Sequence, residues 1–272
     1  MSNKYKNKVI INENQVLKNY NKNIFEIYEI FELVNFENYP KIIEYDERNI
    51  KYEFIESKKY HEKIKNEEFI KTVALLHSKT QEYKEVGLEK YKKVYDILNN
   101  NINYMKKYYE ELINNIEDEI YMSPSNYLIA RNYTSIIMTL DNAINYLKKW
   151  YKIVENKTNE RVCVIHNNLS INHFIKSNKN YLISFDGARV DTPVLDLYKL
   201  YKKELLKFDF TLLFKIYNDE FNLTDEEKYL FYSMISIPPK VNKLDDELND
   251  TYNISEIFRY IYKTINFVNK NK

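Results

Sequence analysis

The segment IHNNLSINHF, residues 165–174, decides the fold of this chain. It starts at the end of a strand-forming run, Val162–Ile165, which is followed directly by His166 and, further on, by His173. Polar loops that follow buried strands commonly carry the chemistry of a protein. This loop contains no carboxylate. It therefore differs from sites in which a pair of acids transfers protons or binds a metal.

The composition is that of a globular protein. The chain has 272 residues, of which 44% are hydrophobic and 30% charged, and this length allows a sizeable core. Its 41 basic and 40 acidic residues give a net charge of +1, which argues against nucleic acid as a partner. The single cysteine, Cys163, excludes an intramolecular disulfide and lies in an apolar run, so we expect it to be buried.

The sequence also bears on where in the cell the protein is found. The first residues are polar, which predicts no signal peptide. No apolar run reaches the ~20 residues that a membrane span needs. We therefore expect a cytoplasmic protein without a membrane span.

Glycine is scarce, with Gly87 and Gly187 the two examples. Loops of the forms GxGxxG and GxxxxGK[ST] bind phosphates through several closely spaced glycines. The sequence therefore excludes the classical dinucleotide-binding and P-loop folds.

The first part of the chain predicts a small α+β unit. Strand-forming residues at 8–11 and 15–20 flank a turn-forming stretch, which indicates a hairpin. Apolar residues at helical spacing predict a helix over 24–34, with its glutamates off the apolar face. A second hairpin is expected over 41–56.

The chain then becomes mostly helical. A helix near 67–80 carries His77 on its apolar face, where a hydrogen-bonded core histidine is more common than a metal ligand. Two long series of apolar residues, joined by a short connection, predict an antiparallel helical hairpin over 89–155. Ser123 is the expected N-cap of its second helix. The acidic run Glu117–Glu119 lies near the tip, where it is either a solvated helix end or a site for a cation.

The remaining segments supply shorter elements. A strand is expected at 181–185 and a helix after Pro193. Thr224 and Glu227 form the pattern of a capping box at the start of a further helix. A last amphipathic helix is expected over about 254–268.

Together these elements and the motif H-x-x-L-x-x-x-H-F-I…I-S-F-D-G-A-R…T-P-V-L-D-L resemble the aminoglycoside phosphotransferase and choline kinase-like family. Within that family, the chain looks most like the spore-coat-associated members of endospore-forming bacteria. The resemblance is specific over Val162–Leu197 and otherwise follows the order of elements. It implies a bilobal, protein-kinase-like α+β fold, with a reduced β-rich lobe at 1–57 and a helical lobe at 58–272.

The resemblance also assigns positions in the two loops. The family's catalytic loop, H-G-D-x-x-x-x-N, places His166 on the histidine, Asn168 on the aspartate that receives or orients the substrate proton, and His173 on the Mg²⁺-binding asparagine. The family's second motif, I-D-F, places Ser184 on the principal Mg²⁺-binding aspartate, and Asp186 follows two residues later.

Three further roles follow from the resemblance. Asp196, in a segment that matches the family, is the residue expected to brace the catalytic loop. Lys18 occupies the place of the phosphate-binding lysine, or is a solvated strand lysine. Glu29 or Glu32, on the following helix, would pair with it.

The residues that differ from the family's motifs are those that would carry out catalysis and bind Mg²⁺. An amide at Asn168 cannot accept a proton near neutral pH, and general-base assistance is worth roughly 10²–10⁴ in rate. Ser184 has no charge to offer Mg²⁺, and a histidine suits that ion poorly. The sequence therefore predicts a pseudokinase that acts as a binding or scaffolding protein at the spore coat, with degenerate catalytic motifs.

Other interpretations stay open. Asp186 could bind the metal while His166 acts as base, leaving an atypical ATP- and Mg²⁺-dependent phosphotransferase for an amino sugar, choline or a polyol. For such a cationic ligand, the run Glu117–Glu119 or Trp150 is the expected contact. The cleft could instead bind ATP without transfer, as a sensor. In a last interpretation, His166, His173 and Asp186 ligate a transition metal.

Overall fold

The computed structural model describes residues 10–12, 15–20, 23–244 and 246–271. Of the first expected hairpin, Lys8, Val9, Glu13 and Asn14 lie outside the described residues. The chain divides into two compact units, which we call the first unit (Met1–Tyr83, Arg161–Leu200 and Leu212–Asn222) and the second unit (Lys84–Glu160, Tyr201–Thr211 and Leu223–Lys272). The expected lobes 1–57 and 58–272 follow a different boundary, and that division stays a prediction.

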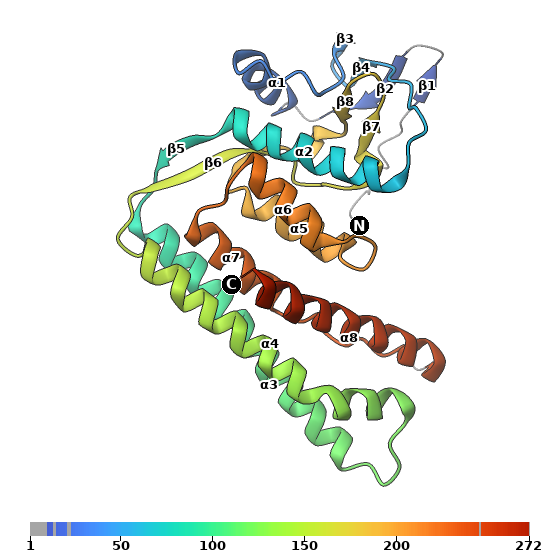
Figure 1. Ribbon diagram of the computed structural model, residues 1–272, viewed down its shortest axis with the longest axis vertical. Coiled ribbons are helices and arrows are strands. Elements are labelled where there is room, and N and C mark those ends of the chain that lie inside the picture. Colours follow the sequence, from blue (N-terminus) through green and yellow to red (C-terminus); the bar gives the residue numbers. More distant parts are fainter. Residues whose placement is uncertain (1–9, 13–14, 21–22, 245, 272) are drawn as a thin grey trace. The chain divides into compact units, whose positions relative to one another are not determined.

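The first unit begins with an antiparallel sheet and one helix (Figure 1). The strand order is β1-β2-β4-β3, and α1 connects β2 to β3. Lys18 of β2 lies opposite Ile50 of β4. The bounds are β1 (Ile10–Asn12), β2 (Gln15–Asn19), α1 (Asn23–Leu33), β3 (Ile42–Tyr45) and β4 (Asn49–Glu53). The hairpin–helix–hairpin order expected from the sequence is confirmed.

An aromatic core holds this part of the first unit together. The helix α1 buries Ile24, Ile27, Tyr28 and Phe31, because they recur at helical spacing on one face. The Phe31 ring lies 5.0 Å from that of Phe36 and 5.1 Å from that of Phe185, measured between ring centroids. Phe185 thus joins the loop after β8 to this core.

The rest of the first unit frames the loop 165–174. Its elements are α2 (Glu62–Thr80), β6 (Asn159–Ile165), β7 (Phe174–Lys176), β8 (Asn180–Leu182), β9 (Arg189–Asp191), α5 (Val194–Glu204) and α6 (Phe210–Glu220), some of which continue into the second unit. The strand β6 pairs antiparallel with β9, and β7 with β8. Cys163 of β6 is buried, as expected.

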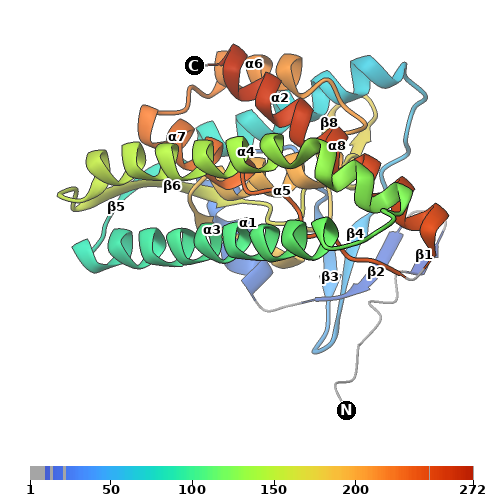
Figure 2. The same cartoon turned by 90° about the horizontal axis from the view of Figure 1, so that it is seen from below.

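The second unit is built on the expected helical hairpin. The helices α3 (Leu88–Glu117) and α4 (Pro124–Val154) pack side by side, as Figure 2 shows, and α7 (Asp225–Ile235) and α8 (Glu247–Lys270) pack on α4. Ser123 caps α4 through the backbone N–H of Asn126. The capping box of Thr224 and Glu227 at the start of α7 is confirmed. In the part of the chain that is described, no helix is long and apolar enough to cross a membrane.

Some elements differ from the expectation. The helix α6, the strands β7 and β9, and β5 (Glu82–Glu85) have no counterpart in the sequence prediction. The strand expected at 181–185 ends at Leu182, because Ser184 adopts a left-handed backbone conformation that a strand cannot continue through.

Candidate functional site

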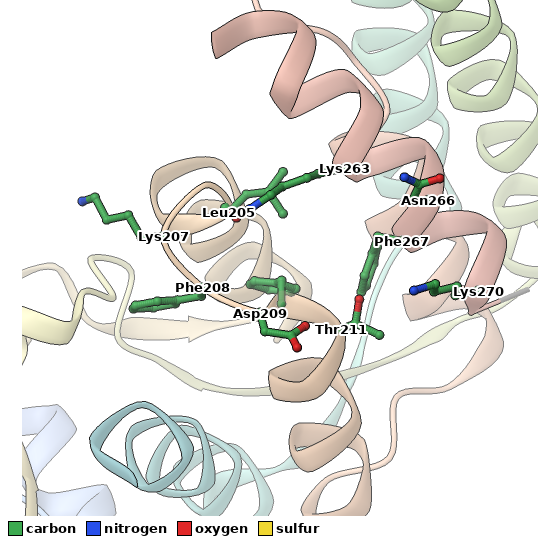
Figure 3. A pocket seen from close by; sticks show the side chains of 10 residues that line it. Leu205, Lys207, Phe208, Asp209, Thr211, Lys263, Asn266, Phe267 and Lys270 are labelled. Atoms are coloured by element: carbon green, nitrogen blue, oxygen red, sulfur yellow. Dashed lines mark hydrogen bonds between the residues drawn. The ribbon is translucent and has the colours of Figure 1, made fainter. Parts of the chain in front are cut away.

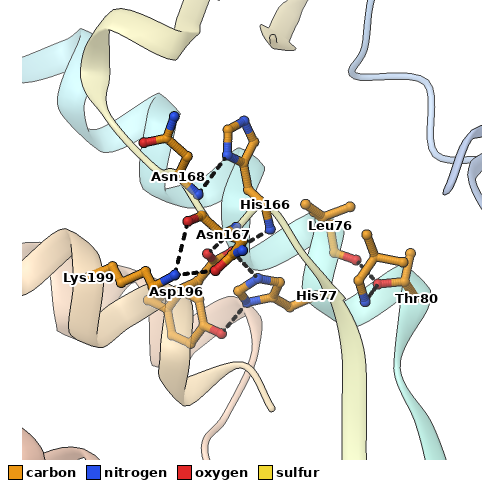
Figure 4. A network of polar contacts seen from close by, with 10 residues as sticks. Leu76, His77, Thr80, His166, Asn167, Asn168, Asp196 and Lys199 are labelled. Atoms are coloured by element: carbon orange, nitrogen blue, oxygen red, sulfur yellow. Dashed lines mark hydrogen bonds and ion pairs between the residues drawn. The ribbon is translucent and has the colours of Figure 1, made fainter. Parts of the chain in front are cut away.

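The loop after β6 is held by one buried carboxylate, that of Asp196 (Figure 4). Its Oδ2 accepts a hydrogen bond of 2.7 Å from the backbone N–H of His166, and its Oδ1 accepts one of 2.7 Å from that of Asn167. His77 of α2 approaches Oδ2 with Nε2 at 3.2 Å, and its Nδ1 lies 2.6 Å from the hydroxyl of Tyr217. His77 is therefore a hydrogen-bonded core histidine, as expected.

A left-handed corner follows His166. Asn167 has φ of 64°, a value that costs little for glycine or asparagine and more for other residues. The Asn167 amide donates to the carbonyl of Gly187 over 2.9 Å, while Lys199 donates to its side-chain and backbone oxygens. The corner is thus fixed on both sides.

The ring of His166 is fully buried and committed to backbone partners. Its Nε2 donates to the carbonyl of Ile183 over 2.8 Å, and its Nδ1 accepts from the N–H of Asn168 over 3.3 Å. Burial lowers the pKa of His166 below its usual value, because the charged imidazolium loses hydration. With these bonds in place, neither ring nitrogen is available to take a substrate proton or to bind a metal.

Asn168 and His173 lie at the open side of the same loop. The Asn168 side chain is exposed. The backbone carbonyl of Asn168 accepts a hydrogen bond of 2.8 Å from Nδ1 of His173. The rings of His166 and His173 are stacked with centroids 5.8 Å apart. The structure thus brings these three residues together, with the His173 ring held by a backbone carbonyl.

The second loop turns sharply at Ser184. Its backbone has φ of 69° and ψ of 50°, and the next residue, Phe185, is buried with its ring 4.8 Å from that of His166. Because Phe185 anchors the loop in the core, Asp186 is held at a fixed place on the other side of the turn. Sequence reasoning did not identify Phe185 as the residue that positions Asp186.

Asp186 forms an ion pair with Lys18 of β2. The side chain of Lys18 is 11% exposed and that of Asp186 30% exposed, so this lysine is not a solvated strand residue. The expected pairing with Glu29 or Glu32 is wrong: Lys18 pairs with Asp186, while both glutamates lie exposed on α1. The physical reason is that α1 turns its apolar face, which includes Tyr28 and Phe31, to the core.

Two tyrosines lie beside this ion pair. Burial raises the pKa of Tyr28 well above its ordinary value, with the neighbouring hydroxyl of Tyr52 adding to the effect. Burial also raises the pKa of Tyr52, and the negative charge of Asp186 raises it further. Both hydroxyls therefore stay protonated at neutral pH and can donate hydrogen bonds. Sequence reasoning missed them, although Tyr28 falls on the apolar face that it identified.

A cavity of about 220 Å³ opens at this ion pair. Its walls are mainly apolar, with Lys18, Asp186 and the two tyrosines at one side. The lining residues are Ile11, Val16, Lys18, Tyr28, Pro40, Tyr52, Glu53, Phe54, Ile55, Ile175, Ile183, Ser184, Phe185 and Asp186. Typical small-molecule pockets measure about 300–1,000 Å³. The cavity therefore has room for a flat ring system rather than for a large ligand.

Another cavity, of about 420 Å³, belongs to the second unit (Figure 3). It lies between the segment 205–211 and the last turns of α8, and none of the residues singled out from the sequence lines it. Lys263 on its wall donates to the carbonyls of Leu205 and Leu206, which directly follow α5. Trp150 is elsewhere in the second unit, 3% exposed and packed on Tyr91, so it is not available to a cationic ligand.

No protein-family model and no curated protein sequence matches the chain. Solved structures do match. An aminoglycoside phosphotransferase from Alicyclobacillus acidocaldarius is similar over 97% of this chain and 92% of its own, with a TM-score of 0.66 and 8% identity.

Two further structures are similar more weakly. A spectinomycin phosphotransferase solved with ADP and spectinomycin matches 92% of this chain and 85% of its own, with a TM-score of 0.47 and 12% identity. The choline kinase of Streptococcus pneumoniae matches 99% and 92%, with a TM-score of 0.45 and 15% identity. The first similarity, at 8% identity, shows the fold alone. On the strength of the first similarity, the chain has the kinase-like α+β fold of an aminoglycoside phosphotransferase.

Proposed function

We propose that this chain is a pseudokinase, which uses a kinase-like fold to bind other molecules and does not transfer phosphate. The observation that carries the proposal is the state of the expected catalytic positions. Asn168, His173 and Ser184 stand where the resemblance places two aspartates and an asparagine, and Asp186, two residues after Ser184, is paired with Lys18.

The first support is the lack of a base. The Asn168 amide cannot take a proton from an alcohol near neutral pH. His166 is the other candidate, but both of its ring nitrogens are hydrogen-bonded to the backbone. The atypical phosphotransferase in which His166 replaces the aspartate would have to break these bonds first.

The second support is the poor fit to a metal–nucleotide complex. Mg²⁺ prefers several oxygen ligands in near-octahedral geometry. The two loops offer Asp186, which is shared with Lys18, and the uncharged Ser184. The described residues contain no group of three or more His, Cys, Asp or Glu side chains arranged to hold a metal ion. These residues therefore do not fit Mg²⁺-ATP.

The cavity beside Lys18 favours a second candidate function, nucleotide binding without transfer. Its apolar walls suit a purine ring. Phe54 and Ile55, which directly follow β4, line it as well. Lys18 could then exchange Asp186 for a phosphate.

The proposal is tested with the purified chain, radiolabelled ATP and Mg²⁺, using an amino sugar, choline and a polyol as acceptors. We expect no transfer by the wild type, and none by Asn168→Asp, because the base alone does not restore the metal site. Acceptor-dependent transfer that disappears in Asp186→Ala would establish the phosphotransferase instead.

Nucleotide binding is tested separately by thermal unfolding. A ligand that binds only the folded chain raises the melting temperature. We expect ADP and ATP to raise it equally with Mg²⁺ or with EDTA, and Lys18→Met to weaken the effect. Stabilisation that requires Mg²⁺ would contradict our account of the metal site, and no stabilisation at all would leave the cavity without this function.

The proposal extends to the place of action. The segment Val162–Leu197 resembles the spore-coat-associated members of the family, so we propose that the chain assembles at the surface of a developing spore. A fluorescent fusion in sporulating cells should then form a ring around the forespore. A diffuse signal throughout sporulation would refute this assignment.

A further inference from the structure

The second unit carries a group of large apolar side chains that face solvent. Ile120 and Tyr121 are each 91% exposed in the loop that joins α3 to α4, at the end of the hairpin in Figure 1. Leu248 of α8 is 82% exposed. The full group, which we call the tip surface, is Ile120, Tyr121, Met122, Tyr127, Leu244, Leu248 and Tyr252. Isolated exposed apolar residues are ordinary, but grouped ones mark interaction sites.

Hydrogen bonds hold the two halves of the tip surface together. Glu247, at the start of α8, accepts from the backbone N–H of Ser125 over 2.6 Å and from its hydroxyl over 3.0 Å. Lys243 donates to the side chain of Asn126. Leu244 is also held to α8, because Asp250 accepts from its N–H over 2.7 Å. These hydrogen bonds therefore hold the exposed apolar residues in place relative to one another.

The charged side chains around the tip surface are mostly acidic. Among the described residues of 117–127 and 241–252, there are five exposed acidic side chains and one exposed basic side chain, that of Lys243. The exposed acidic residues are Glu117, Asp118, Glu119, Asp246 and Glu247. The whole chain, by contrast, carries a net charge of +1. The excess of negative charge is therefore local.

We propose that the tip surface is a docking site for a protein segment that carries lysine or arginine among apolar side chains. The apolar and aromatic residues supply contact area, and the acidic residues supply complementary charge and partner selection. A second copy of this chain is a poor occupant, since two acidic surfaces would repel each other. An anionic membrane is disfavoured for the same reason.

Docking at the tip surface does not depend on the absence of phosphoryl transfer. The tip surface and the cavity beside Lys18 belong to different units and are tested by different measurements. A chain that transfers phosphate can still use the tip surface, and a pseudokinase can lack this partner.

The test uses a fluorescent synthetic peptide with leucine and lysine at helical spacing, and a counterpart with glutamate in place of lysine. We expect the lysine peptide to bind and the glutamate peptide not to. The double variant Ile120→Ser, Tyr121→Ser should weaken binding about tenfold or more, as loss of central contacts does. Glu117→Lys, Asp118→Lys should weaken it too and reduce its dependence on salt.

Ile97→Ser is the matched control, because Ile97 is an apolar residue of α3, 64% exposed and outside the tip surface. It should bind the peptide as the wild type does. A photoreactive peptide should cross-link within 117–127 or 241–252. Unchanged binding by the tip variants, equal binding of the glutamate peptide, wild-type dimers broken by the tip variants, or preference for anionic vesicles would each overturn the proposal.

Discussion

Asp196 connects three segments that are far apart in the sequence. Its two oxygens accept from the backbone at His166 and Asn167, and from His77 of α2. The carboxylate is fully buried, so each of these bonds replaces water that the charge gave up on folding. The geometry of the loop after β6 therefore depends on one side chain.

We expect Asp196→Asn to destabilise the chain by about 3 kcal/mol, because an amide presents an N–H group to donors that need an acceptor. Urea unfolding followed by circular dichroism measures the change. Asp141→Asn is the control, since Asp141 is 54% exposed and its pair with Lys106 spans 3.5 Å. Equal effects of the two substitutions would contradict the bracing role of Asp196.

His166 should make the chain less stable in mild acid. Its pKa in the folded chain lies below the ordinary value near 6.5, because it is buried. As the pH falls below about 6.5, the unfolded chain binds a proton that the folded chain does not, so unfolding is favoured. Above that pH both states are neutral and the effect is absent. The loss can reach about 1.4 kcal/mol per pH unit.

The measurement is the free energy of unfolding between pH 7.5 and pH 5, for the wild type and for His166→Gln. The slope should be smaller in the variant. Carboxyl groups with lowered pKa values, such as those of Glu68 and Glu226, begin to lose their contribution only near pH 5, and they are the same in both proteins. Identical slopes would mean that His166 takes up a proton as readily when folded.

At the level of elements, α7 shows how local signals fix a helix end. The Thr224 N–H donates to Oε2 of Glu227 over 2.9 Å, and the Glu227 N–H approaches Oγ1 of Thr224 at 3.5 Å. Such reciprocal bonds satisfy backbone donors that a helix start leaves without partners. Because both partners lie three residues apart, this capping box can be recognised from residue types and spacing alone.

Thr224→Ala should lower the free energy of unfolding by about 1 kcal/mol, the usual effect of removing an N-cap side chain. Thr224→Ser keeps the hydroxyl and should stay close to the wild type. Thermal or urea unfolding of the three proteins gives the comparison. If the serine variant lost as much as the alanine variant, packing of the threonine methyl would be the cause rather than capping.

At the level of the whole molecule, each unit is assembled from segments that are separate in the sequence. The hairpin of α3 and α4 is continuous, yet α4 is covered by α7 and α8. Ser233 donates to the carbonyl of Ala143 over 2.9 Å, and the ring of Tyr146 lies 5.4 Å from that of Tyr232. Neither unit can be obtained by cutting the chain once.

The fragment 84–160 should therefore form helix without a cooperative melt and should associate as its concentration rises, because the face that α7 and α8 cover is exposed. Circular dichroism and analytical ultracentrifugation measure both properties. Addition of the fragment 223–272 should restore a cooperative transition. A sharp, concentration-independent melt of the hairpin alone would show that it folds without those helices.

The strongest sequence patterns predicted the largest elements. The apolar faces of α3 and α4 could be predicted, as could the order hairpin, helix, hairpin, because many residues repeat the same spacing. The strands β5, β7 and β9 have three or four residues each, too few for alternation to show. The helix α6 was missed, since it follows the apolar cluster at Phe208–Phe210 without a glycine or proline to mark its start.

The sequence placed the candidate residues in loops but did not indicate which side chains pair. The motif placed His166, Asn168, His173, Ser184 and Asp186 in two loops, and the structure brings these loops together. The ion pair of Lys18 and Asp186 joins positions 168 apart, which no local pattern reports. The exposure of Glu29 could nevertheless be predicted from the sequence, because the periodicity that predicted α1 placed its glutamates outside the buried face.

The scarcity of glycine has a last consequence, for the backbone corners. None of the described positive-φ corners is a glycine; Asn35, Asn167 and Ser184 occupy them. A left-handed conformation at a residue with a side chain is less favourable than at glycine, so tertiary contacts must hold it. Two of the three corners flank the cleft loops. Replacing Ser184 with glycine would relieve that strain, but it would also allow this corner more backbone conformations, so Asp186 would be held less firmly in place.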